Sequence, residues 1–442
     1  MTPPAGAVGQ RERGLWWASP PGVLLLILPL SLLLAVFTSD IDFRLLYRTP
    51  KVLTGPDTRL MMFAGAFVLL GTLLPLVLRG GGWARPWPGF DERQLATLRR
   101  SADVCFYLTI VGYVAFGLAG LARGVSVSDI TGVLTSQDNY SGGLKQAFAP
   151  VTGITTLTQV GLAYVVLGGL LLINGHGNGV RRRLAVVVVL ALLRAFFLTE
   201  RLAVVEVVVP LALLLAVHRS QRVRPPWWLP SAPVLALPVL IAGFGLFEYS
   251  RSWVFFRSRT TSSFPEFVVN RLAGYYSTAY NNSAIQLHHD APLGGLPYAS
   301  LEALWTAPGA QQLHLYERLT GVDGPASYAL LLEQFGTPEF NNPGGLAVPL
   351  IDFGVPVGLL IMLVVGILVG AAYRSFRSGS PLGLLIYPLV FTGLLELPRY
   401  FYWTQGRLVP AVLVLGITSV LLRRRPLPVP APLAAPSRAV HR

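Results

Sequence analysis

Apolar runs alternate with short polar connections along most of this chain. The runs lie at 22–38, 60–78, 101–121, 153–174, 184–199, 202–217, 231–248, 346–372, 382–397 and 406–422. An α-helix needs about 20 apolar residues to cross the hydrocarbon of a bilayer, and most of these runs approach that length. The pattern therefore predicts an all-α fold, a polytopic transmembrane helical bundle of about ten spans.

The polar segment 249–345 breaks this pattern between the seventh and eighth predicted spans. It is rich in aromatic and polar residues and too irregular for a further span. We expect a large external loop of short amphipathic helices that lie at the membrane interface and cap a cavity. Asn270, Arg271, Tyr275 and Tyr276 are expected to face that cavity. Packing of the two tyrosines against the bilayer surface is the competing interpretation.

The composition agrees with one membrane domain. Hydrophobic residues make up 53% of the chain and charged residues only 13%, far from the balance of a soluble protein. We expect residues 1–425 to form a single membrane domain that includes the external cap loop. The Pro- and Ala-rich residues 426–442 are expected to form a disordered cytoplasmic tail.

The net charge of +14 comes largely from arginines in short connections. Alternating spans place the connections at 79–100, 181–183, 219–224, 374–377 and 423–425 on one side of the membrane. Short basic loops mark the cytoplasmic side, so both termini are expected in the cytoplasm. Because the basic residues are spread over short loops, nucleic-acid binding is not expected.

Four charged residues lie at membrane depth where two predicted spans meet, in LLRAFFLTERLAVVEVVV at 192–209. They are Arg194, Glu200, Arg201 and Glu206. Ionisable groups at this depth are costly and usually have a task, although a neutralised structural ion pair is the alternative. The two arginines suit an anion such as a lipid-linked phosphate.

A second candidate binding segment is ELPRYFYWTQGRLVP at 396–410, in which Arg399 and Arg407 enclose several aromatic residues. Guanidinium groups bind phosphate oxygens bidentately and aromatic faces pack on sugar rings, although an aromatic belt explains the rings equally well. The adjacent His288, His289 and Asp290 lack a further ligand at a standard spacing, so we expect no metal site and no cofactor.

The order of these features resembles the Wzy-type O-antigen polymerases, a family of oligosaccharide repeat-unit polymerases. The resemblance covers roughly residues 150–420 and is carried by NRLAGYY at 270–276, APLGGLPYASLEALWTAP at 291–308 and GGLAVPLIDFGVPVGLLIMLVVGILVGAAYR at 344–374. Arg201 stands where such proteins tend to have a Ser-Arg pair, so Glu200 is a departure from the family pattern.

The resemblance implies a multi-pass enzyme of the bacterial cytoplasmic membrane that joins undecaprenyl-diphosphate-linked oligosaccharide repeat units at the outer face. Its partners would be this lipid-linked substrate and membrane lipids, and a chain-length regulator is left open. The arginines at 194, 201, 271, 399 and 407 would hold the diphosphate. The candidate bases for the acceptor hydroxyl are Glu200, Glu206, Glu339 and Asp352, of which Asp352 is favoured as a structural residue at a helix entry.

Three alternatives remain open at this point. A GT-C glycosyltransferase that uses a polyprenyl-phosphate sugar also has many spans, and Asp40 and Asp42 follow the first span where such enzymes carry acidic residues. A transporter of the same lipid-linked glycan would show internal symmetry, which the two halves of this chain lack. A related O-antigen ligase would differ only in its acceptor.

Overall fold

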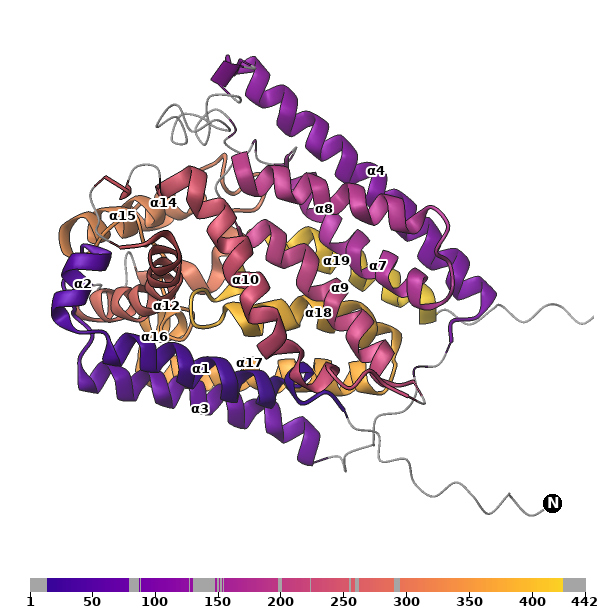
Figure 1. Ribbon diagram of the computed structural model, residues 1–442, viewed down its shortest axis with the longest axis horizontal. Helices are drawn as coiled ribbons and strands as arrows, with labels where there is room; N and C mark the ends of the chain where they lie inside the picture. Colours follow the sequence, from indigo (N-terminus) through magenta and orange to yellow (C-terminus); the bar gives the residue numbers. More distant parts are fainter. Residues whose placement is uncertain are drawn as a thin grey trace, which may run out of the picture.

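Within the residues that the structure describes, all regular secondary structure is helical (Figure 1). The computed structural model describes residues 14–78, 87, 89–126, 128–129, 148, 151, 153, 155–197, 201–222, 224–253, 256–258, 262–289 and 295–423. The α-helices are α1 Pro20–Phe37, α2 Asp40–Tyr47, α3 Gly55–Val77, α4 Glu92–Ala122, α7 Val160–Ile173, α8 Val180–Phe197, α9 Leu202–Ser220, α10 Ala232–Glu248, α12 Phe264–His289, α13 Glu302–Trp305, α14 Leu315–Thr320, α15 Gly324–Phe335, α16 Val348–Phe353, α17 Val355–Arg377, α18 Pro381–Glu396 and α19 Val409–Arg423. The predicted tail 426–442 and Glu200 lie outside the described residues.

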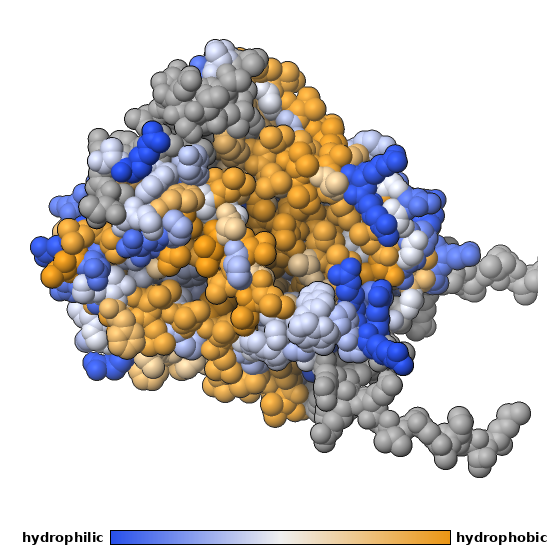
Figure 2. All heavy atoms as spheres, in the orientation of Figure 1, coloured by the Kyte–Doolittle hydropathy of each residue, from blue (hydrophilic) through white to orange (hydrophobic). Residues whose placement is uncertain are grey.

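The chain is a multi-pass helical membrane protein. Eight helical segments of the described residues are long and apolar enough to cross a membrane: Pro20–Phe37, Gly55–Val77, Glu92–Ala122, Thr156–Ile173, Leu202–Ser220, Leu229–Glu248, Val355–Arg377 and Gly406–Arg423. Two further predicted spans correspond to α8, which is rich in arginine, and to α18, which has 16 residues. The predicted number of ten spans therefore stays a prediction. Figure 2 shows an apolar surface across the middle of the molecule, with hydrophilic residues gathered toward both ends.

Helix α7 forms the centre of the bundle. Every residue from Val160 to Leu171 is buried, because α4, α8, α9, α18 and α19 all pack around this helix. A helix that is apolar on all sides is stable only when it is surrounded in this way. Its sequence accordingly lacks the polar face that a helix at a water-exposed surface would have.

Helices α3 and α17 approach each other through glycines. A Cβ atom at Gly71 would lie 2.3 Å from the backbone oxygen of Leu363, and one at Gly366 would lie 2.3 Å from that of Val68. Small residues at such a crossing let two backbones pack closely, which stabilises helix pairs in membranes through van der Waals contact. The pair lies along one side of the molecule together with α1 (Figure 1).

The polar segment between α10 and α16 differs from the predicted set of short helices. Its main element is the 26-residue helix α12, and most side chains from Phe267 to Gln286 are buried within the protein. Three short helices, α13, α14 and α15, follow it. The polar residues that made this stretch look interfacial are instead hydrogen-bonded inside the protein, which sequence periodicity does not distinguish from exposure to water.

The buried amides of α12 hold two extended loops. The side chain of Asn281 accepts hydrogen bonds from the backbone N–H groups of Val52 and Leu53, at 2.6 and 3.0 Å. Asn282 donates to the carbonyl oxygens of Phe340 and Asn342, at 2.6 and 3.0 Å. Because buried backbone groups need partners, these amides fix the loops that precede α3 and α16 against α12.

The segment NNPGG at 341–345 packs between α12 and the loop that follows α18, and it contacts both. The backbone N–H of Gly344 donates to the carbonyl oxygen of Arg399 at 2.9 Å, and Gly344 has a φ of +79° that favours glycine. A Cβ at Gly345 would lie 2.4 Å from the backbone oxygen of Tyr400. The two glycines therefore position the Arg399 loop next to α12.

The two ends of the bundle differ. We call the end formed by α2, α12 to α16 and residues 397–408 the capped end; it lies at the left of Figure 1. At the opposite end, Trp16 donates to the carbonyl oxygen of Pro230, and Gln94 donates to that of Leu422. Both ends of the described chain thus lie at this opposite end. The side of the membrane that each end faces stays a prediction.

Candidate functional site: buried arginines and a cavity at the capped end

A buried carboxylate joins two of the predicted arginines at the capped end. Glu248, the last residue of α10, is fully buried and forms ion pairs with Arg201 at the start of α9 and with Arg271 on α12. The Arg271 Nε atom lies 3.3 Å from Glu248 Oε2. A second carboxylate, Glu339, accepts from Arg271 Nη1 at 2.7 Å. Arg271 is thus held between one carboxylate at the end of α10 and another in the loop after α15.

A third arginine reaches the same place from the loop after α18. Arg399 forms an ion pair with Glu396 at 3.0 Å, and the guanidinium carbons of Arg201, Arg271 and Arg399 lie 5.1, 6.0 and 5.5 Å from the ring centre of Tyr275. We call these three arginines the arginine cluster. Cations at such distances interact favourably with an aromatic ring.

The arginine cluster is an unusual arrangement in energetic terms. Like charges repel strongly where water is scarce, so three guanidinium groups around one ring persist only with counter-charges beside them. Glu248, Glu339 and Glu396 supply these charges. Each carboxylate is bound to one or two arginines, and an anion that enters the cluster can take over part of this role.

A second charged group lies alongside, centred on Glu206 of α9. Its carboxylate is buried, accepts a hydrogen bond from the Tyr402 hydroxyl at 2.9 Å and lies 3.7 Å from Arg407 Nη1. Arg194, near the end of α8, donates to the Thr158 hydroxyl at 3.1 Å. Arg194 thus contacts Thr158, whereas Arg201 contacts Glu248 in the arginine cluster described above.

A cavity of about 430 Å³ lies under the short helices of the capped end. We call it the cap cavity. Its lining includes the tyrosines at 298, 316, 328 and 400, the carboxyl residues Glu302 and Asp352, and the amide residues Gln286, Asn341 and Gln405. Tyrosine rings and amides are the groups that contact the faces and hydroxyls of a sugar. Tyr400 connects the two parts of the site, because its ring centre lies 5.2 Å from the guanidinium carbon of Arg399.

Glu302 lines the cap cavity, and the pKa of its carboxyl group is shifted. Burial raises its pKa from the ordinary value of 4.5, and the nearby Arg407 partly opposes this rise. A carboxylate with a raised pKa is a stronger base than an exposed one. Glu302 can therefore accept a proton from a hydroxyl group that occupies the cavity.

Asp352 has a structural position. Its two carboxylate oxygens accept hydrogen bonds from the backbone N–H groups of Tyr298 and Ser300, at 3.2 and 2.5 Å, so the residue fixes the cap loop to α16 while it lines the cavity.

The structure brings Arg201, Arg271, Tyr275 and Arg399 together, and Tyr276 lies next to Arg399, with 5.9 Å between the ring centre and the guanidinium carbon. Within the described residues, no group of three His, Cys, Asp or Glu side chains is placed to hold a metal ion. His288 instead contacts Asp57 at 3.0 Å and His289 stacks on Phe335. Asp290 lies outside the described residues.

Three carboxylates of the site were not predicted: Glu248, Glu302 and Glu396. Glu248 and Glu396 each end an otherwise apolar helix. A lone acidic residue at the end of an apolar run can indicate a buried ion pair, and this signal was present in the sequence. Glu302 lies in a short helix of the capped end and has no comparable signal. Comparison with known proteins found no matching family model, curated protein or solved structure.

Proposed function

We propose that this protein is a membrane glycan polymerase that transfers a growing glycan from its polyprenyl diphosphate onto the sugar of a second lipid-linked repeat unit. The observation that carries the proposal is the arginine cluster around Tyr275, next to a cavity lined by tyrosines and amides. This arrangement provides a diphosphate site and a sugar site side by side.

The arginine cluster fits the leaving group. In the transfer step the acceptor oxygen forms a bond to the anomeric carbon, and the bond between that carbon and the lipid diphosphate breaks. Negative charge then accumulates on the diphosphate oxygens, and fixed guanidinium groups stabilise it more in the transition state than in the bound substrate. Because the three arginines come from α9, α12 and the loop after α18, their positions are set by the fold before substrate binds.

The cap cavity fits the acceptor. An attacking hydroxyl must lose its proton, and Glu302 is the carboxyl group that lines the cavity and has a raised pKa. Three of the predicted base candidates lie within the described residues and are otherwise engaged: Glu206 with Tyr402 and Arg407, Glu339 with Arg271, and Asp352 with two backbone N–H groups. We therefore assign the role of base to Glu302 in this proposal.

The GT-C alternative relies on Asp40 and Asp42. Both lie in the first turn of α2, where acidic residues interact favourably with the helix dipole, and Asp42 accepts a hydrogen bond from the Ser39 hydroxyl at 2.7 Å. These contacts account for the two residues as helix-capping groups. The arginine cluster and the cap cavity favour transfer from a diphosphate.

The test is the glycan profile of a strain that lacks the gene, complemented with the wild-type gene or with an Arg201→Ala variant. Loss of long polymer together with complete single repeat units on the outer leaflet is the expected result for both the deletion and the variant. A repeat unit short by one sugar would instead indicate a GT-C transferase. Complete units retained on the inner leaflet would indicate a transporter, and normal polymer without transfer to its final anchor would indicate a ligase.

A further inference from the structure

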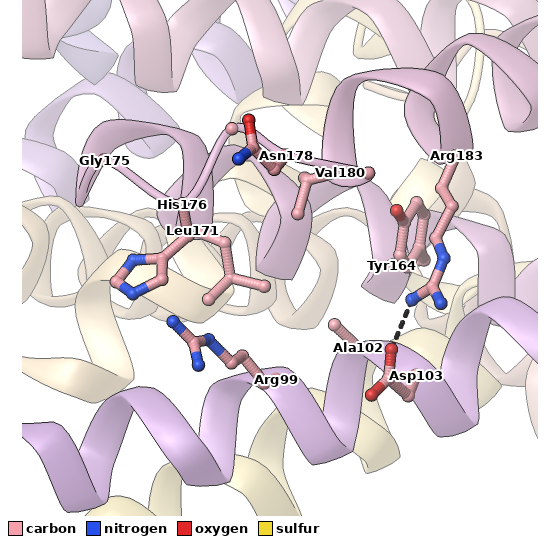
Figure 3. Close-up of a pocket in the computed structure, with 12 residues that line it drawn as sticks. Arg99, Ala102, Asp103, Tyr164, Leu171, Gly175, His176, Asn178, Val180 and Arg183 are labelled. Atoms are coloured by element: carbon pink, nitrogen blue, oxygen red, sulfur yellow. Dashed lines mark hydrogen bonds and ion pairs between the residues drawn. The ribbon is translucent and has the colours of Figure 1, made fainter.

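A second pocket lies at the opposite end of the bundle, between α4, α7 and the start of α8 (Figure 3). Its volume is about 400 Å³, and its lining includes Arg99, Asp103, His176, Asn178 and Arg183. The glycine-containing segment 175–179 forms its rim between α7 and α8. None of these residues belongs to the arginine cluster or to the cap cavity.

The basic side chains of this pocket come from α4, from the segment between α7 and α8, and from the start of α8. Figure 3 shows the imidazole of His176 next to the guanidinium of Arg99, and Arg183 paired with Asp103 across the pocket. The Nδ1 atom of His176 is buried and has no hydrogen-bond partner among the described residues. The side chain of Arg99 likewise forms neither a hydrogen bond nor an ion pair with any described residue. Two adjacent nitrogen groups with unused donor capacity provide a favourable site for an anion.

Exposed apolar side chains next to the pocket favour a lipid headgroup over a free anion as its ligand. Beyond Asp103 toward the middle of α4, Val104, Tyr107 and Val111 are each more than half exposed. On the neighbouring α8, Val186 and Val189 are also exposed, at 42% and 53%. An apolar surface that begins directly next to a basic pocket provides room for acyl chains beside a bound headgroup.

We propose that this pocket binds the phosphate of an anionic phospholipid, with Arg99 and His176 as donors to the phosphate oxygens. Arg183 adds positive charge, and its pairing with Asp103 fixes its orientation; its guanidinium carbon also lies 5.1 Å from the ring centre of Phe106. The acyl chains lie along the exposed apolar faces of α4 and α8. The site is independent of the proposed glycan chemistry, since it lies at the other end of the molecule.

The experiment uses the purified full chain in a neutral detergent, with phosphatidylglycerol that carries a fluorescent acyl chain as the probe. Phosphatidylcholine with the same label tests headgroup charge, and inorganic phosphate is added as a competitor. The variants are Arg99→Gln and His176→Gln, and the matched control is Arg100→Gln, which removes the same charge from the next residue of α4 and does not line the pocket.

We expect Arg99→Gln to weaken phosphatidylglycerol binding about 10-fold, the size of one charge-assisted contact, and Arg100→Gln to leave it within about 2-fold. His176→Gln is expected to weaken binding to a smaller extent. Phosphatidylcholine is expected to bind less tightly than phosphatidylglycerol. Equal effects of Arg99→Gln and Arg100→Gln would overturn the site, and displacement of the lipid by inorganic phosphate at micromolar concentration would overturn its assignment to a lipid.

Discussion

Arg271 is the residue of the arginine cluster with the most demanding contacts. Its guanidinium group is bound by Glu248 through one nitrogen and by Glu339 through another, and the side chain is almost fully buried. A planar guanidinium group can satisfy two carboxylates at a fixed angle, whereas an ammonium group is a single point charge. The role of Arg271 therefore depends on geometry as well as on charge.

We expect Arg271→Lys to reduce polymer formation by at least about 10-fold, because one charge-assisted hydrogen bond, worth about 1.5–3 kcal/mol, is lost in a buried site. Arg257→Lys is the control, since Arg257 is exposed. Polymer is measured with purified protein and lipid-linked repeat units, and protein amount and melting temperature are measured in parallel. Equal activity of Arg271→Lys and the wild type would remove Arg271 from the proposed site.

Replacement of Glu302 by glutamine is expected to affect activity and stability in different ways. Burial raises the pKa of its carboxyl group, so the folded protein binds this proton more tightly than the unfolded chain does. This difference lowers folding stability as the pH rises above the ordinary pKa of 4.5. We therefore expect Glu302→Gln to abolish polymer formation and to unfold at an equal or higher temperature than the wild type at neutral pH.

The pH dependence of the reaction provides a second measurement on the same residue. A base acts only when ionised, so wild-type activity should increase with pH through an apparent pKa above 4.5. Glu333→Gln, a change of an exposed carboxylate on α15, is the control and should alter neither quantity. Full activity of Glu302→Gln would show that another group takes the proton.

At the scale of elements, α12 connects the site to the rest of the bundle. Arg271 and Tyr275 lie on its first half, and Asn281, Asn282 and Gln286 on its second half bind loops that precede α3 and α16. The helix thereby couples the position of the arginine cluster to the extended NNPGG segment. A defect in the second half of α12 should affect the whole capped end.

Asn282→Ala is expected to lower the free energy of unfolding by about 1–3 kcal/mol, because two buried carbonyl oxygens lose their donor. Val269→Ala changes an exposed side chain of the same helix and should have a much smaller effect. Thermal unfolding of the detergent-purified proteins measures both changes. Identical melting temperatures for the two variants would contradict the role given to the buried amide.

The close crossing of α3 and α17 predicts that a larger residue at Gly366 lowers the stability of the protein. A Cβ atom at Gly366 would lie 2.3 Å from the backbone oxygen of Val68, so Gly366→Ala must push the two helices apart. We expect a loss of about 1–3 kcal/mol of stability. Gly416→Ala on α19 is the matched control, since a Cβ atom there meets nothing within 4 Å and alanine favours the helix.

At the scale of the whole molecule, the described chain ends lie at one end together with the basic residues Arg99 and Arg183, and the arginine cluster lies at the other end. The positive-inside tendency then predicts that the capped end faces outward. Single cysteines in a Cys105→Ala background test this, at Gln312 of the capped end and at Ser378 of the opposite end, both exposed. A membrane-impermeant maleimide should label intact cells at Gln312→Cys and only lysed cells at Ser378→Cys; the reverse pattern would invert the proposed topology.

The sequence by itself determined the class of the protein and the positions of most helices. Hydrophobic runs fix helices in a bilayer because the backbone has no other way to satisfy its hydrogen bonds there. The sequence also indicated Arg201, Arg271 and Arg399, because charged groups near apolar runs are costly unless they have partners or a task.

Only the tertiary structure decided which of these residues meet. Arg201, Arg271 and Arg399 are separated by long stretches of chain, and they converge because α12 is buried within the protein. The pattern of α12 did not predict this, since a polar residue with a buried hydrogen-bond partner has the same sequence signature as one that faces water. Glu302 became a candidate for the same reason: its chemistry depends on burial and on neighbours distant in sequence, which the order of residues alone does not specify.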